Sequence, residues 1–384
     1  MSYENTGKGT KRTNALPPFA ELKALVSSKL NVVDAFVDAR NIPTFMIAPG
    51  IVEEKFKELV FESYDRGLTP TLRQDNGHFI LRFFIRPAIK KVSNRRNILL
   101  FAVTLLTIFL AGYYLWTTNE LWSKLLMPMA SPYAQAALFT VCLISIIGVH
   151  EMAHKLTCDF HKIKATFPFF VPGPPPFGTF GAVISLKSPP INRNQLFDLG
   201  ISGPIAGFIA TIIVGILSIL TSTMISESQL AELGGMVGPV TWPSSPLLFL
   251  LITHPSVSSL MLHVPKEMTP ILGQVIFAAW IGSLLTFLNT LPIWQLDGGH
   301  VARAVLGPKG HKMASVVGLG VLFFSGFWVF ALLLLFFIMV GRRSWAGVEP
   351  LDDVSPLSNS RKMSFFILLV ISALCFSPLV SPLL

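Results

Sequence analysis

Three ionisable side chains within five positions carry the most direct chemical information in this chain. They are His150, Glu151 and His154, in the sequence HEMAH, and the sixteen residues before them, 134–149, contain no ionisable side chain. On a helix, two positions four apart lie about 40° apart around the axis and about 6 Å along it, so both histidines can bind one cation. Glu151 lies about a quarter-turn away, where it can accept a proton from water at that cation.

A purely structural role is the alternative for the same residues. The two histidines can be hydrogen-bonded inside a helical bundle, with Glu151 paired to Lys155. Ionisable side chains at membrane depth are expensive, however, and usually functional. The apolar stretch before the motif therefore favours the metal-binding interpretation.

A catalytic zinc site usually has three protein ligands, so a third residue is needed. Cys158 and His161 follow the motif closely, but both fall in a more polar stretch that we expect to lie beyond the helix. Asp297 is the better candidate, because it follows the fourth apolar run in NTLPIWQLDGGH (residues 289–300). Pro292 would end the helix there, and the glycine pair after Asp297 would let the chain turn sharply. A helix-capping role for Asp297 is the alternative.

Composition predicts a polytopic α-helical membrane protein. Hydrophobic residues make up 52% of the 384 residues, charged residues 13%, and the mean hydropathy is +0.60, which excludes an ordinary soluble domain. We expect about six transmembrane helices with a three-helix catalytic core. Gly203 and Gly207 predict close packing of the third helix against the motif helix. The six apolar runs are Ile98–Trp116, Tyr133–Val149, Leu199–Met224, Ile271–Leu291, Ala314–Val340 and Ser364–Val380.

Positive charges predict the orientation of these spans. The net charge is +9, but the basic residues collect beside the spans, so a membrane surface is expected as the partner and nucleic acid is not. Basic residues before the first run and after the motif place both segments in the cytoplasm, and the basic-poor stretch 226–269 outside. If Ala314–Val340 is one span, Arg342 and Arg343 fall outside, although the same rule expects basic residues in the cytoplasm. That run is therefore either a broken pair of helices or part of an irregular topology. The short run Leu247–Ile252 is expected to be interfacial or re-entrant.

The chain divides into four segments. Residues 1–16 are expected to be a disordered tail, 17–95 a small cytoplasmic α/β domain, 96–345 the membrane-embedded catalytic domain, and 346–384 a linker and last transmembrane helix. In the small domain, helical spacing recurs around residues 22–30 and 56–64, and Asp75-Asn76-Gly77 predicts a tight hairpin between strands at 69–74 and 78–85. Its role is either anchoring or substrate gating. Three scattered cysteines predict no disulfides, and the 95 mixed-polarity residues before the first span predict no cleavable signal peptide.

A proline-rich segment follows the motif and leads into a predicted strand. The prolines of PGPPP (residues 172–176) forbid a regular helix, whereas residues 178–186 alternate like a strand. An exposed strand edge beside the site can pair with an unwound substrate. Gly178, Phe180 and Gly181 are therefore candidate substrate-binding residues. The alternative is a hairpin that only shields the site.

Four motifs in this order resemble the site-2 protease family of intramembrane zinc metalloproteases, peptidase family M50. They are HEMAH, GTFGAVI, LFDLGISGPIAG and NTLPIWQLDGGH, and the resemblance covers residues from about 95 to about 340. It is strongest to the branch with an N-terminal soluble domain and no PDZ insertion. The resemblance implies that His150, His154 and Asp297 bind one zinc ion per chain and that Glu151 is the catalytic base. It also implies that Asn289 holds the substrate backbone.

The expected function is hydrolysis of peptide bonds in or near transmembrane segments of membrane-protein substrates. The expected setting is the cell membrane, with several spans and with the N-terminus and active site toward the cytoplasm. A bulky Trp294-Gln295 pair departs from the family pattern, which bears on substrate preference. Two alternatives remain: a catalytically inactive homologue that binds transmembrane partners, and a membrane metal transporter. The sequence indicates no oligomeric state.

Overall fold

The chain forms two compact units. A computed structural model describes residues 16–86, 94–118, 131–226, 246–252, 268–271, 274–340 and 347–377. The N-terminal unit comprises residues 1–91, 189–193 and 349–356, and the helical unit contains the remainder. Several predicted features lie outside the described residues: Lys90, Lys91 and the Arg342-Arg343 pair. All but the last residue of the predicted tail, 1–16, also lies outside them.

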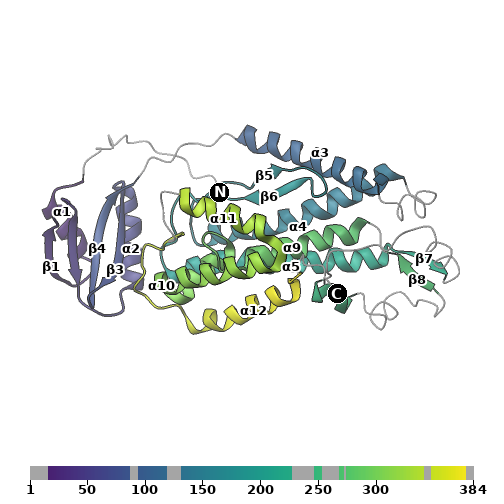
Figure 1. The fold of residues 1–384 in the computed structure, drawn as a ribbon. Coiled ribbons are helices and arrows are strands. Elements are labelled where there is room, and N and C mark those ends of the chain that lie inside the picture. Colours follow the sequence, from purple (N-terminus) through teal and green to yellow (C-terminus); the bar gives the residue numbers. More distant parts are fainter. Residues whose placement is uncertain are drawn as a thin grey trace. The chain divides into compact units, whose positions relative to one another are not determined.

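The N-terminal unit is a four-stranded antiparallel sheet with two helices. The strand order is β1-β2-β4-β3, and α1 packs against β1 and β2 whereas α2 packs against β3 (Figure 1). The elements are α1 (Phe19–Ser27), β1 (Val32–Val37), β2 (Pro43–Ile47), α2 (Glu53–Asp65), β3 (Leu68–Asp75) and β4 (His78–Ile85). The small α/β fold predicted for this region is confirmed. The β1 and β2 strands were not predicted.

The hairpin between β3 and β4 follows from its two turn residues. Asp75 pairs with His78, which leaves Asn76 and Gly77 as a two-residue turn. Their φ angles are +46° and +82°, and positive φ at both positions is the pattern that matches the twist of a hairpin. The helical spacings also hold, because the apolar residues of α1 and α2 are buried in one core. That core includes Leu22, Leu25, Val26, Leu30, Phe56, Leu59 and Val60.

Two segments distant in sequence complete this unit. The Leu72 N–H donates to the Leu351 carbonyl at 2.8 Å, and the Asp353 N–H donates to the Leu72 carbonyl at 3.1 Å. The Leu351 N–H in turn donates to the carbonyl of Pro190 at 2.9 Å. Residues 349–356 therefore lie along the outer edge of β3, an edge that would otherwise expose unpaired backbone groups.

In the part of the helical unit that the structure describes, two short strand pairs and one short helix lie among long apolar helices. Its elements are α3 (Asn94–Thr118), α4 (Pro132–Phe160), β5 (Phe169–Pro172), β6 (Thr179–Val183), α5 (Arg193–Leu220), β7 (Thr223–Ser226), α7 (Leu247–Ile252), β8 (Met268–Ile271), α9 (Gln274–Thr290), α10 (Asp297–Leu322), the π-helical turn η2 (Phe323–Phe327), α11 (Trp328–Val340) and α12 (Asn359–Cys375). Pro132 occupies the first turn of α4, where its missing N–H removes no helical hydrogen bond. The motif helix therefore begins 18 residues before His150.

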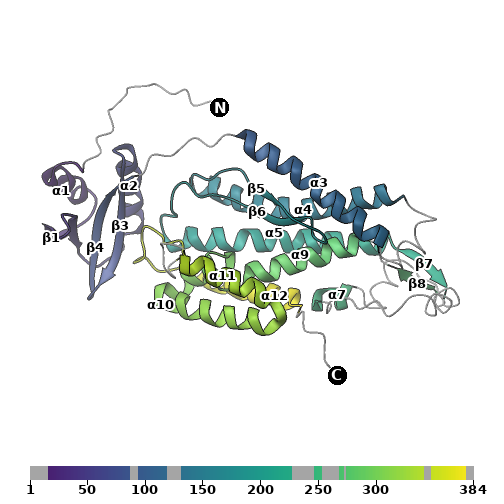
Figure 2. The same cartoon turned by 45° about the horizontal axis from the view of Figure 1, so that its top comes forward.

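Three of these helices form the core that was predicted. Helices α4, α5 and α9 run side by side in both views (Figures 1 and 2). Gly282 of α9 contacts both neighbours, because a Cβ placed on it would lie 2.6 Å from Thr211 of α5 and 2.9 Å from Ile146 of α4. Further along, the rings of Phe139 and Phe277 stack with centroids 6.1 Å apart.

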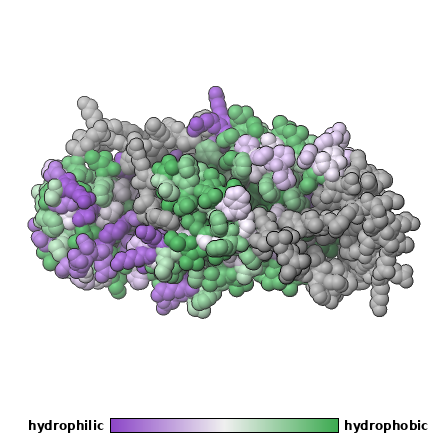
Figure 3. All heavy atoms as spheres, viewed as in Figure 1, coloured by the Kyte–Doolittle hydropathy of each residue, from purple (hydrophilic) through white to green (hydrophobic). Residues whose placement is uncertain are grey.

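The described residues contain four helices long and apolar enough to cross a membrane. They are residues 95–118, 132–160, 193–220 and the composite 297–340. Two further predicted spans are shorter: α9 and α12 each have 17 residues, about 26 Å of helix, against a hydrocarbon thickness of about 30 Å. Figure 3 shows hydrophobic side chains over much of the visible face of the helical unit, as lipid contact requires.

The run Ala314–Val340 is a broken helix pair. Gly326 has a φ of +92°, and the chain reverses there through η2 so that α11 packs back along α10 (Figures 1 and 2). An L side chain rarely adopts this φ, so glycine allows the reversal. Of the two possibilities that the sequence left open, the broken pair is confirmed. An earlier break in α10 lies at Gly307 and Pro308.

A β hairpin covers part of the helical core. Strand β6 pairs with β5 in antiparallel register, and the two strands pack against α3 and α4. The predicted strand over 178–186 is present but is shorter, at Thr179–Val183. Its turn is held on α3, where the Thr107 hydroxyl donates to the Gly178 carbonyl at 2.7 Å.

We predict that Gly77→Ala destabilises the β3–β4 hairpin by about 1 kcal/mol, because an L residue at this left-handed position is strained although its Cβ meets no atom. Hydrogen exchange of the β3 and β4 amides in the full chain measures the effect. Gly50→Ala is the matched control, since its Cβ also meets no atom and its φ is not left-handed. Equal exchange in the two variants would contradict the prediction.

Candidate metal centre

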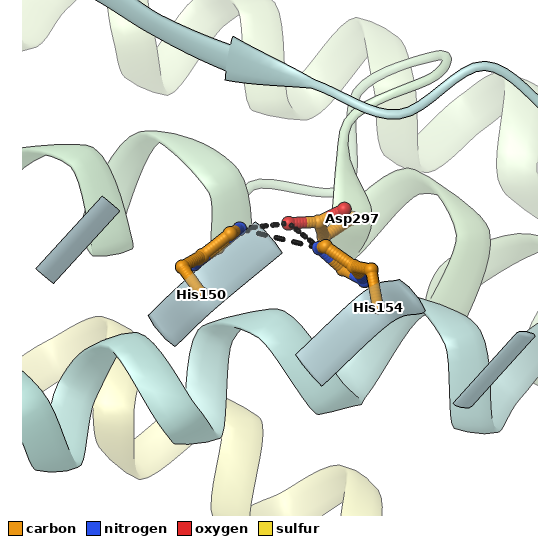
Figure 4. Close-up of side chains that lie close together, drawn as sticks. All are labelled: His150, His154 and Asp297. Atoms are coloured by element: carbon orange, nitrogen blue, oxygen red, sulfur yellow. Dashed lines mark hydrogen bonds and ion pairs between the residues drawn. The ribbon is translucent and has the colours of Figure 1, made fainter. Parts of the chain in front are cut away.

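Two turns of one helix and the first residue of another bring three electron-rich atoms together. His150 and His154 lie on α4, and Asp297 begins α10 (Figure 4). The Asp297 Oδ2 atom lies 3.1 Å from His150 Nε2 and 3.2 Å from His154 Nε2, and the two Nε2 atoms are 3.2 Å apart. Among the described residues, these three are the group able to hold a metal ion. Four-coordinate zinc with ligands at about 2.0 to 2.1 Å requires ligand atoms about 3.3 Å apart, which this triangle matches.

A hydrogen bond fixes the tautomer of His154. Its Nδ1 atom lies 2.8 Å from the carbonyl oxygen of Leu199 on α5. A carbonyl only accepts hydrogen bonds, so Nδ1 carries a proton, and in the neutral ring Nε2 presents a lone pair toward Asp297. An outer hydrogen bond of this kind orients most histidines that bind metals. The Ser202 hydroxyl also donates to the same carbonyl, at 3.1 Å.

Helix α5 approaches both histidines through glycines. A Cβ placed on Gly203 would lie 2.1 Å from His154 Nε2, and one on Gly207 would lie 2.8 Å from His150 Nδ1. The predicted close packing of this helix against the motif helix is therefore correct, and the histidine rings are what it contacts. Nearby, Pro204 lacks an N–H, so one carbonyl of the preceding turn loses its helical donor.

The aspartate reaches the site because α9 and α10 meet closely. A Cβ on Gly298 would lie 2.0 Å from the carbonyl oxygen of Thr290, at the end of α9. The six-residue connection, 291–296, can therefore be tight. As the sequence predicted, the glycine after Asp297 permits the turn. It does so because Gly298 has no side chain to separate its backbone from that of Thr290.

Glu151 lines one cavity with the three candidate ligands, and its side chain is buried. Its exposed fraction is 7%, the same as that of each histidine. The cavity has a volume of about 200 Å³ and is also lined by β6 and by polar residues from α9 and α10. Its remaining lining residues are Ala182, Val183, Ile184, Leu186, Leu199, Asn289, Gln295, Leu296 and His300.

The structure brings some of the predicted substrate-binding residues to the cavity but not all. Asn289 lines it, with Nδ2 3.5 Å from His150 Nε2. Gly178, Phe180 and Gly181 do not line it. Gly178 is packed on α3, and the Phe180 side chain is 72% exposed. The cavity instead borders the next residues of the strand, from Ala182.

Sequence reasoning missed two polar lining residues and misplaced one alternative ligand. Gln295 and His300 flank Asp297, and His300 follows it by nearly one helical turn, a spacing that marks it as a neighbour. Cys158 lies inside α4. We expected it beyond the helix because its neighbours in sequence are polar. It is buried beside Ile163 and Leu199, apart from the three ligands. His161 instead bonds Asp198, at 2.9 Å.

We predict that Gly203→Ala abolishes tight metal binding. The new methyl group would push the His154 ring by more than about 1 Å, whereas a metal site tolerates ligand displacements of only about 0.2 Å. Zinc content after dialysis against a chelator measures the loss. Gly148→Ala is the matched control. Gly148 lies two residues before His150 on the same helix, and a Cβ placed on it would meet no atom. A Gly203→Ala protein that retains zinc like this control would refute the packing argument.

Comparison with known proteins places the chain in a family. A sequence profile of peptidase family M50 matches residues 138–334. The chain is 30% identical over 236 residues to the probable zinc metalloprotease EGY2, chloroplastic, of Oryza sativa subsp. indica, a match covering 59% of this chain and 39% of that protein. It is 28% identical over 258 residues to the probable zinc metalloprotease EGY1, chloroplastic, of Arabidopsis thaliana, covering 66% and 45%.

The chain thus spans less than half the length of these curated relatives. No solved structure matches it. The profile match extends over more than half of the 384 residues and includes all three members of the metal-binding group. The chain belongs to peptidase family M50.

Proposed function

We propose that this protein is an intramembrane zinc metalloprotease of the site-2 type, which hydrolyses peptide bonds in or near transmembrane segments of membrane-protein substrates. The observation that carries the proposal is a buried carboxylate, Glu151, in one cavity with the His150, His154 and Asp297 group. His150, Glu151 and His154 lie on α4, a helix long and apolar enough to cross a membrane, and Asp297 begins α10 beside it. Such a cluster is expensive in that setting unless it is functional.

Zinc is the metal that this donor set fits. Two imidazole nitrogens and one carboxylate oxygen are a common catalytic zinc set, and they leave a fourth position open for water or substrate. One zinc ion per chain would supply Lewis acidity, which polarises a peptide carbonyl and acidifies water at the site. The printed names of the relatives also support zinc.

Glu151 is the proposed general base and acid. It does not belong to the metal-binding group but lines the same cavity, so water between the two is within its reach. As the water oxygen forms a bond to the substrate carbonyl carbon, Glu151 takes one proton from that water. When the carbon–nitrogen bond breaks, Glu151 gives this proton to the leaving nitrogen.

The substrate must be locally unwound to react. A transmembrane helix holds its peptide carbonyls in its own hydrogen bonds, so a peptide bond inside it becomes accessible only where the helix has locally unwound. Strand β6 borders the cavity and can hydrogen-bond an extended segment through its main chain. We therefore propose substrate contact along β6, with Asn289 holding the backbone near His150. Phe180 and Gly181, at the outer part of this strand, and Gly178, in the turn before it, remain predictions.

Charge distribution supports a proposed orientation in the membrane. Lys162, Lys164 and Lys187 follow the motif helix in sequence, which favours a cytoplasmic location for the active-site end. We propose a multi-pass cell-membrane protein with its N-terminal domain, residues 17–95, in the cytoplasm. Residues 96–345 would then carry the protease, and residues 346–384 the linker and last helix.

A Glu151→Gln variant is predicted to keep its zinc and to lose cleavage of a single-span test substrate. The amide preserves the shape of the side chain but cannot accept the proton, and removal of a general base lowers rates by about 100-fold or more. Zinc content and fragment formation in reconstituted vesicles measure the two effects. Glu58→Gln is the control, since that residue is an exposed partner of Lys29 in the N-terminal unit.

Three outcomes would contradict the proposal. Cleavage that persists in Glu151→Gln would remove this residue from the chemistry. Wild-type protein that binds zinc but cleaves no transmembrane substrate would favour the inactive homologue. Zinc movement across the vesicle membrane, without cleavage, would instead favour the transporter.

A further inference from the structure

The loop that delivers Asp297 to the metal centre has an unfavourable backbone conformation. Residues 291–296 join the end of α9 to the start of α10, and Trp294 in this loop has a φ of +43°. A bulky L residue rarely adopts left-handed φ, because its Cβ crowds the following carbonyl. Such a conformation persists only where surrounding contacts hold it.

Two side chains of α10 bond the backbone at this residue. The Trp294 N–H donates to the Ser315 hydroxyl oxygen at 3.1 Å, and the His311 ring donates from Nε2 to the Trp294 carbonyl at 3.1 Å. The Ser315 hydroxyl in turn donates to the Pro292 carbonyl at 3.1 Å. Both backbone polar groups of Trp294 are therefore bound by side chains from the helix that Asp297 begins.

The donors and acceptors of this arrangement are mutually consistent. A hydroxyl has one hydrogen to donate and lone pairs to accept, and Ser315 uses both functions. Because the Trp294 carbonyl can only accept, His311 must be protonated on Nε2, and its buried Nδ1 has no hydrogen-bond partner. Both side chains are 0% exposed, so water does not compete for these bonds.

The contact extends along one face of α10. His311, Ser315 and Gly318 are spaced by four and three residues, which places them on the same side of the helix. A Cβ on Gly318 would lie 2.7 Å from Cγ1 of Ile293 and 3.3 Å from Cδ of Pro292. This face thus fits against three consecutive loop residues, Pro292 to Trp294.

We propose that His311 and Ser315 are positioning residues that hold the left-handed turn at Trp294 and so place the Asp297 carboxylate against the two histidines. This inference rests on the proposed zinc site. Neither residue lines the cavity, so both act through the loop and not on the substrate. If the turn relaxed, the chain direction three residues before Asp297 would change, and Oδ2 would leave its position beside the Nε2 atoms.

The test combines two measurements on the full-length protein in detergent. Zinc affinity is measured by competition with a chelator, and hydrogen exchange of the peptide spanning residues 291–297 is measured on the metal-free protein. The variants are Ser315→Ala, His311→Leu and His311→Gln, the last of which keeps an N–H donor. Ser325→Ala is the control, because its buried hydroxyl bonds only the Val321 carbonyl in its own helical turn, at 2.6 Å.

We expect Ser315→Ala and His311→Leu to weaken zinc binding about 10-fold, as loss of outer partners of metal ligands commonly does, and to speed exchange in residues 291–297. His311→Gln should restore most of the affinity, and Ser325→Ala should match wild type in both measurements.

Three results would overturn the proposal. Unchanged exchange in Ser315→Ala and His311→Leu would show that the side chains do not hold the turn. Faster exchange with unchanged zinc affinity would show that the turn does not position Asp297. Equal weakening in Ser325→Ala would assign the effect to general packing. Wild-type protein that binds no zinc would refute the proposed function, and the positioning role with it. That failure is distinguishable from the other three, because in those the wild-type protein still binds zinc.

Discussion

Electron-rich atoms 3.1 to 3.2 Å apart repel one another unless a cation or a shared proton lies between them, and the centre of this protein is built on such a contact. The Nε2 atoms of His150 and His154 and the Oδ2 atom of Asp297 form the triangle. His154 donates its Nδ1 proton to the Leu199 carbonyl, so in the neutral ring the inward nitrogen offers a lone pair. Inside an apolar helical unit this repulsion is weakly screened, which is the physical reason for expecting a cation there.

The surrounding helices serve to maintain that contact. Helix α4 supplies the histidines on one face, and α5 approaches them through Gly203 and Gly207, so that its backbone limits the movement of both rings. Helix α9 contacts both of these helices and ends where the loop to Asp297 begins. The β5–β6 hairpin then borders the cavity at Ala182 and Val183.

Features that depend on local spacing could be predicted from the sequence. The two histidines share a helix face because they are four residues apart, and the Asn76-Gly77 turn follows from two residues that tolerate positive φ. Asp297 could be proposed because topology places the ends of two apolar runs at one depth.

The pairing of Leu72 with Leu351 could not be predicted, since backbone hydrogen bonds between distant segments leave no local pattern. The reversal at Gly326 lies in a continuous apolar run, where hydropathy alone cannot separate one span from two short helices. Gly178, Phe180 and Gly181 lie outside the cavity lining for a related reason, because alternation identifies a strand but not which part of it borders a cavity.

X-ray absorption at the zinc edge of the purified full-length protein tests the central claim most directly, because it reports the atoms bound to the metal. The account predicts about one zinc per chain, with nitrogen and oxygen neighbours at about 2.0 to 2.1 Å, two of them imidazoles, and no sulfur. A sulfur neighbour at about 2.3 Å would contradict it, since that distance would bring Cys158 into the site in place of Asp297.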